Sequence, residues 1–166
     1  MSTTRQRCKA GATAPASRVA LLALLLAALA PANAQIAIHT TRNLEFGKFV
    51  AAAGGTLSVD TNGARSRSGG VVLMASSGAS ASFTIIDTNP ANIGKVYAIT
   101  LPDNGTATLS NGASSMALSN FTSAPSLTGL LTGGTQVLQV GATLAVGASQ
   151  PPGSYSGTFV VTVEYQ

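Results

Sequence analysis

The chain has 166 residues and a formal net charge of +4, with nine Lys and Arg against five Asp and Glu. Four of the basic residues precede residue 19, so residues 35–166 carry five charges of each sign and are neutral. This balance excludes the basic surface that binds nucleic-acid phosphates. The single cysteine, Cys8, excludes a disulfide within the chain.

The first 34 residues have the pattern of a secretory signal peptide. A positively charged leader precedes the apolar run Val19–Ala30, and Ala32-Asn33-Ala34 then places small residues at the two positions that a signal peptidase inspects. We predict cleavage between Ala34 and Gln35. The apolar run is too short to cross a bilayer, which needs about 20 residues, so no stable membrane span is expected in the mature chain.

After residue 35, short apolar runs alternate with turn residues, and no segment keeps helical spacing over ten residues. The runs that we predict as strands are Leu44–Ala51, Thr56–Asp60, Gly70–Ala75, Ala81–Asp87, Lys95–Leu101, Thr106–Ser110, Ser115–Phe121, Thr135–Val140, Ala142–Val146 and Tyr155–Tyr165. Many short strands separated by Asn-Gly, Pro and Gly predict one all-β domain over residues 44–166, either a β-sandwich or a closed barrel. Gly141 indicates a bulged strand or a tight hairpin, and Ser123–Gly134 is predicted to be a loop.

The last predicted strand has the clearest alternation. Its odd-numbered residues from Tyr155 to Tyr165 are Tyr, Gly, Phe and Val, and its even-numbered residues are mostly Ser, Thr and Glu. Side chains alternate between the faces of a strand, so the odd-numbered set is predicted to face the core. The length of this strand predicts that it lies well inside a sheet.

The side chains that most enzymes need are scarce. His39 is the only histidine and lies in the N-terminal segment, away from any evident partner for a general base. No Ser occupies a G-x-S-x-G elbow, and the five acids are spread singly along the chain. We therefore expect no enzymatic activity, no catalytic residue, no metal ion and no cofactor.

The order of several short motifs resembles an uncharacterised family of small exported bacterial β-proteins, over nearly the whole mature chain. These motifs are Leu44-Glu45-Phe46-Gly47-Lys48-Phe49, Gly55-Thr56-Leu57-Ser58-Val59, Gly69-Gly70-Val71-Val72-Leu73, Tyr97-Ala98-Ile99-Thr100-Leu101-Pro102, Val140-Gly141-Ala142-Thr143-Leu144, Gly153-Ser154-Tyr155-Ser156-Gly157-Thr158-Phe159 and Val161-Thr162-Val163-Glu164-Tyr165. That family is similar in turn to chaperone–usher pilins. The shared marks are Phe46-Gly47 and a closing G-x-Y-x-G-x-F segment before the penultimate Tyr165.

Similarity to pilins implies an immunoglobulin-like antiparallel β-sandwich that lacks its final strand, which the N-terminal extension of a neighbouring subunit supplies. The extension would be residues 35–43, with Ile36, Ile38 and Thr40 on the face that enters the partner. The alternation fits equally a segment that simply starts the first strand of its own domain. The implied partners are other copies of the chain or related pilus subunits, with a periplasmic chaperone and an outer-membrane usher.

The leading hypothesis is therefore an exported structural subunit of a pilus-like surface fibre, which passes through the periplasm and assembles by donor-strand exchange. The alternative is a monomeric secreted binding module or adhesin, with a ligand site on the loop at Ser123–Gly134.

Overall fold

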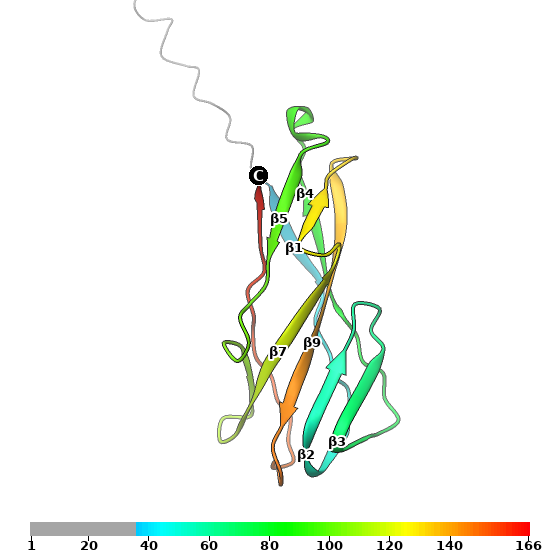
Figure 1. Cartoon of the computed structure of the whole chain (residues 1–166), viewed down its shortest axis with the longest axis vertical. Coiled ribbons are helices and arrows are strands. Elements are labelled where there is room, and N and C mark those ends of the chain that lie inside the picture. Colours follow the sequence, from blue (N-terminus) through cyan, green and yellow to red (C-terminus); the bar gives the residue numbers. More distant parts are fainter. Residues whose placement is uncertain (1–35) are drawn as a thin grey trace, which may run out of the picture. The chain divides into compact units, whose positions relative to one another are not determined.

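Ten strands and one short 3-10 helix occupy residues 36–166, the part of the chain that the computed structural model describes (Figure 1). The predicted signal peptide and its cleavage site between Ala34 and Gln35 lie outside the described residues. The elements are β1 (Ala37–Arg42), β2 (Phe49–Val59), β3 (Arg65–Leu73), β4 (Ala81–Ile86), η1 (Pro90–Asn92), β5 (Val96–Thr100), β6 (Thr108–Ser110), β7 (Ser115–Ala124), β8 (Thr128–Leu130), β9 (Thr135–Val146) and β10 (Thr162–Tyr165).

The larger of the two main sheets is organised around β9. Strand β4 pairs with the first half of β9, β2 with its second half, and β7 with its middle. Strands β1, β3 and β6 extend the sheet from β4, β2 and β7 respectively. The smaller sheet has β5 between β10 and β8, and every pairing is antiparallel. The predicted all-β antiparallel sandwich is confirmed.

The core has two apolar clusters, arranged along β9. The first lies between β4 and β9 on one side and β5 and β10 on the other, and includes Phe83, Ile85, Tyr97 and Leu138. The second lies against the other half of β9, and its buried residues are Phe46, Leu57, Val59, Val71, Ala107, Met116, Leu118, Ala142, Leu144 and Val146. No strand of the smaller sheet contributes to this second cluster, so chain segments outside the strands border it.

Two local features follow directly from residue type. The Asp60 carboxylate accepts hydrogen bonds from the backbone N–H groups of Asn62 and Ala64, and Gly63 has φ +84°, which closes the predicted turn between β2 and β3. Gly141 lies inside one continuous β9, so of the two alternatives the strand is correct and the hairpin is not. A methyl group on Gly141 would meet the carbonyl oxygen of Val59, so only glycine allows the end of β2 to approach this closely.

Three predicted elements are wrong in extent. The strand predicted at Leu44–Ala51 is interrupted, since β1 ends at Arg42 and β2 begins only at Phe49. Ser123–Gly134 is not a loop: β7 continues through Ala124, β8 pairs with β5, and Leu131 is buried. The segment predicted as one long inner strand, Tyr155–Tyr165, is a strand only over Thr162–Tyr165, and β10 is the edge of its sheet. Its predicted inward face is nevertheless correct, because Val163 is buried and Val160 is 75% exposed.

Candidate functional site

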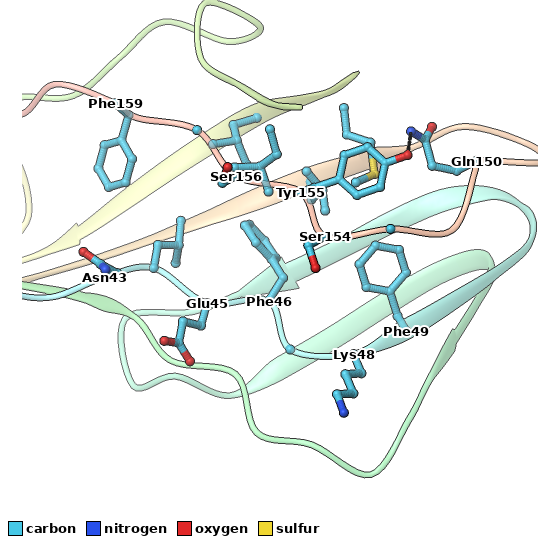
Figure 2. A pocket seen from close by; sticks show the side chains of 18 of the residues that line it. Asn43, Glu45, Phe46, Lys48, Phe49, Gln150, Ser154, Tyr155, Ser156 and Phe159 are labelled. Atoms are coloured by element: carbon cyan, nitrogen blue, oxygen red, sulfur yellow. Dashed lines mark hydrogen bonds between the residues drawn. The ribbon is translucent and has the colours of Figure 1, made fainter. Parts of the chain in front are cut away.

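A pocket of about 1150 Å³ lies against the second core cluster, between two extended segments that are remote in sequence (Figure 2). One wall is residues 43–51, before and at the start of β2, and the other is residues 150–159, which lead towards β10. Apolar side chains of β6, β7 and β9 also line the pocket: Leu109, Met116, Leu118 and Leu144. We call this pocket the groove, and its two borders the first wall and the second wall.

The first wall is held on one side only. Glu45 exchanges two backbone hydrogen bonds of 2.8 Å with Ala79, on the side away from the groove. Gly47 has φ +68°, and a methyl group there would come within 2.6 Å of the Ser77 carbonyl oxygen. This turn brings the Phe46 side chain into the core, whereas the side chains of Glu45 and Lys48 point away from the groove (Figure 2).

Arg65 fixes the position of the first wall. Its guanidinium donates to the carbonyl oxygens of Phe46 (3.1 Å) and Lys48 (3.2 Å) in this wall. The same group donates to the carbonyl oxygens of Met74 (2.9 Å) and Ser76 (2.5 Å) in the neighbouring connection between β3 and β4. One side chain from β3 thus ties together two irregular segments, since the carbonyl oxygens of Phe46 and Ser76 have no other hydrogen-bond donor within residues 36–166.

The second wall is also bonded on one side only. Ser156 exchanges backbone hydrogen bonds with Ser110 of β6, and Thr162 begins the ladder with β5. Successive residues of an extended segment direct their N–H and C=O groups to opposite edges, so Ser156 and Thr162 face β6 and β5. Between them, Thr158 and Val160 have no backbone hydrogen bond to either strand within residues 36–166. The odd-numbered residues, including Gly157, Phe159 and Val161, direct their N–H and C=O groups to the open edge. Within residues 36–166, none of these three backbones has a hydrogen-bond partner.

The side chains of the second wall complete the apolar lining. Phe159 lies edge-on to Phe83, with ring centroids 6.3 Å apart, and is tilted against Phe121 at 5.3 Å. The Tyr155 hydroxyl donates to the Pro151 carbonyl oxygen (2.8 Å) and accepts from the Gln150 amide (3.0 Å; Figure 2). Aromatic rings from both walls, Phe46 and Phe49 facing Tyr155 and Phe159, therefore border the groove.

Beyond the groove, a charged hydrogen-bond cluster fixes the continuation of the second wall at β10. The Tyr165 hydroxyl donates to the Asp87 carboxylate (2.6 Å), which also accepts from the Asn92 amide (2.7 Å) and the Asn89 backbone N–H (2.7 Å). The Tyr165 and Asn89 hydrogen bonds hold the pKa of Asp87 below its ordinary value of 3.8. Burial, together with the hydrogen bond to Asp87, raises the pKa of Tyr165 to about 12.

The residues predicted to donate a strand lie in β1. Ile36 and Ile38 are half-buried against the first core cluster, and Thr40 is exposed and borders the groove. Strand β1 pairs with β4 of the same domain, from Ala37 opposite Ile86 to Arg42 opposite Ser82. The single chain therefore shows the segment as the start of the first strand, and donation to a neighbour stays a prediction.

The sequence did not indicate the groove or the role of Arg65. In the sequence, Arg65 is only one of the five basic residues of residues 35–166, because nothing in a linear pattern shows which carbonyl groups lack partners. The interruption of the strand predicted at Leu44–Ala51 had one signal in the sequence. Gly47 lies within it, and glycine readily adopts positive φ. In the described part of the chain, no group of three or more His, Cys, Asp or Glu residues is placed to hold a metal ion.

Comparison with known proteins places the chain in a family. The model of the family described as a domain of unknown function (DUF4402) matches residues 36–165. The chain belongs to this family. Neither a curated protein nor a solved structure matches the chain. Over residues 36–166, no helix has the length and apolar character needed to cross a membrane.

Proposed function

We propose that this DUF4402 protein is an exported structural subunit of a pilus-like surface fibre, in which an extended segment of one copy enters the groove of the next. The observation that supports this most directly is the open edge of the second wall, where unpaired backbone groups border an apolar groove. Strand addition to an exposed edge uses this combination, because the backbone supplies affinity and the pockets select alternate side chains.

The N-terminal segment of a second copy has the chemistry that the groove requires. Residues 35–43 include one charged residue, Arg42, and present Ile36, Ile38 and Thr40 on one face. An eight-residue strand extends about 26 Å at 3.3 Å per residue, and residues 154–161, which run from the second wall towards β10, are equal in number. Two apolar side chains at alternate positions would fill the space above Met116 and Leu118.

The neutral surface also favours association between copies, because charge repulsion does not oppose it. Export through the periplasm follows from the predicted signal peptide. Delivery by a periplasmic chaperone and an outer-membrane usher follows from the resemblance to pilins. Both proteins would need to protect the open edge before assembly, since exposed edges pair readily with other chains.

The first test is to delete residues 35–41 from the full chain and to follow multimers of the exported product by size-exclusion chromatography and electron microscopy. We expect the wild-type product to form multimers and the deletion variant to remain monomeric. A synthetic peptide with the sequence of residues 35–43 should bind the deletion variant, and a scrambled peptide should not.

Multimers formed equally by both products would contradict strand donation by this segment. A wild-type product that stays monomeric and stable at high concentration would instead favour the binding module. For that alternative, the ligand site would have to use the short connections on either side of β8, because β8 and the buried Leu131 lie within Ser123–Gly134.

A further inference from the structure

Strand β1 is already in use within its own subunit. Its residues from Ala37 to Arg42 pair with β4, and Ile36 and Ile38 pack on the core of the same domain. One segment cannot occupy its own sheet and the groove of a neighbour at the same time. If the proposed function is correct, β1 must therefore leave β4 before a subunit can donate it.

The attachment of β1 is weak for a strand. No residue of β1 is fully buried, and His39, Thr40, Thr41 and Arg42 are all exposed. The ladder with β4 is irregular between Thr40 and Arg42, and β1 is the edge of its sheet. Edge strands with few buried apolar contacts open at a lower free energy than the core.

Side-chain hydrogen bonds concentrate at the C-terminal end of β1, next to the connection that leads into the first wall. The Arg42 guanidinium donates to the Ser80 carbonyl oxygen (2.9 Å), the Ser80 hydroxyl (2.9 Å) and the Gln139 amide oxygen (3.2 Å). Ser80 is fully buried, and its hydroxyl also donates to Gln139 (3.0 Å). Arg42 thus joins β1 to a buried position before β4 and to β9.

We propose that β1 acts as a cap, because it occupies the edge of β4 in its own subunit until a partner is met. The contacts of Arg42 with Ser80 and Gln139 control the release of β1 for donation to a second copy. This inference rests on the proposed function, because the release of β1 matters only if β1 is the strand that fills the groove of a second copy. Opening these contacts frees the end of β1 nearest to Asn43, so that the strand can separate from β4 from this end. The cap keeps a free subunit from donating its strand before it meets a partner.

A reversible covalent lock tests the release directly. His39 and Thr84 are directly opposite each other in β1 and β4, and Cβ atoms of such pairs are close enough for a disulfide after a small adjustment. We would introduce His39→Cys and Thr84→Cys into the full chain together with Cys8→Ser, so that the pair holds the only thiols. The matched control is Thr56→Cys with Ser68→Cys, which links β2 to β3, a pairing that donation does not disturb.

We expect the oxidised β1–β4 lock to prevent multimer formation, and reduction of the disulfide to restore it. The control variant should form multimers at the same rate whether its disulfide is oxidised or reduced. Equal rates with the β1–β4 lock closed and open would overturn the capping role. In that case the groove would be filled by another segment, and the strand-addition function itself could still hold. If neither form of any variant makes multimers, both the proposed function and the cap are wrong.

Arg42 has its own test. Arg42→Gln should accelerate multimer formation about tenfold, which corresponds to about 1.4 kcal/mol, and should increase amide exchange in residues 37–42. Arg67→Gln is the matched control, because Arg67 makes one side-chain hydrogen bond, to the Val71 carbonyl oxygen within β3. Unchanged amide exchange in β1 of Arg42→Gln would refute the role of Arg42, whatever happens to assembly.

Discussion

The role of Arg65 in positioning the first wall gives the sharpest prediction for the fold. Replacing Arg65 with Met keeps most of the aliphatic packing and removes the guanidinium. The carbonyl oxygens of Phe46 and Ser76, which are in partly buried contacts, then lose their donor. The contacts with Lys48 and Met74 are exposed, and water replaces the guanidinium there.

The expected cost follows from the two partly buried contacts. A hydrogen bond to a charged group contributes about 1.5–3 kcal/mol, and solvent access places these two near or below the lower limit. We therefore expect Arg65→Met to lower the free energy of unfolding by about 2–3 kcal/mol. Arg67→Met, which removes one such bond, should lower it by about 1 kcal/mol.

Urea unfolding measures both effects, as a shift in midpoint at an unchanged slope. Amide exchange should show increased opening of residues 44–49 in Arg65→Met alone, because only Arg65 contacts this wall. Equal midpoints for the Arg65 and Arg67 variants, or unchanged exchange in residues 44–49, would refute this account of the wall.

Three further predictions concern the core, a close backbone contact and pH. Leu144→Ala should destabilise the domain by about 3–5 kcal/mol in urea unfolding, because Leu144 is fully buried opposite leucines of β2 and β7. Gly141→Ala should cost at least about 2 kcal/mol in the same assay, whereas Gly133→Ala, with no atom within 4 Å of the new methyl group, should cost less than about 0.5 kcal/mol. Because its pKa is lowered on folding, Asp87 stabilises the fold above pH 3.8, and this contribution should disappear as the pH falls through the lowered value. Because its pKa is raised to about 12, Tyr165 contributes fully below about pH 10 and loses the contribution as the pH rises through 12. Tyr165→Phe should therefore reduce the alkaline loss in a pH series of unfolding midpoints, and the loss that remains is expected from Tyr97, whose pKa is also raised by burial.

The fold class and the inward faces of the strands were predictable because they depend on local sequence. Alternation of apolar and polar residues places the odd-numbered side chains of Tyr155–Tyr165 on the inner face, whatever the strand pairs with. The turn at Asn62-Gly63 was predictable for a similar reason, since Asp60 and a glycine at positive φ close it within five residues. These features need no information from the rest of the chain.

The groove was not predictable in this way. Whether Gly157, Phe159 and Val161 pair on one edge or both depends on where β1, β5 and β6 lie, and alternation indicates a face without indicating a neighbour. The partners of Arg65 depend likewise on carbonyl groups 9 to 19 residues away, in segments that form no regular ladder.

Residue type and a spacing of two were enough to specify an all-β domain with defined inner faces and no net charge over residues 35–166. Which backbone edges remain unpaired, and that residues 37–42 pair with β4, became clear from the three-dimensional arrangement alone. An edge is paired or open according to which strands, remote in sequence, lie beside it in the assembled sheets.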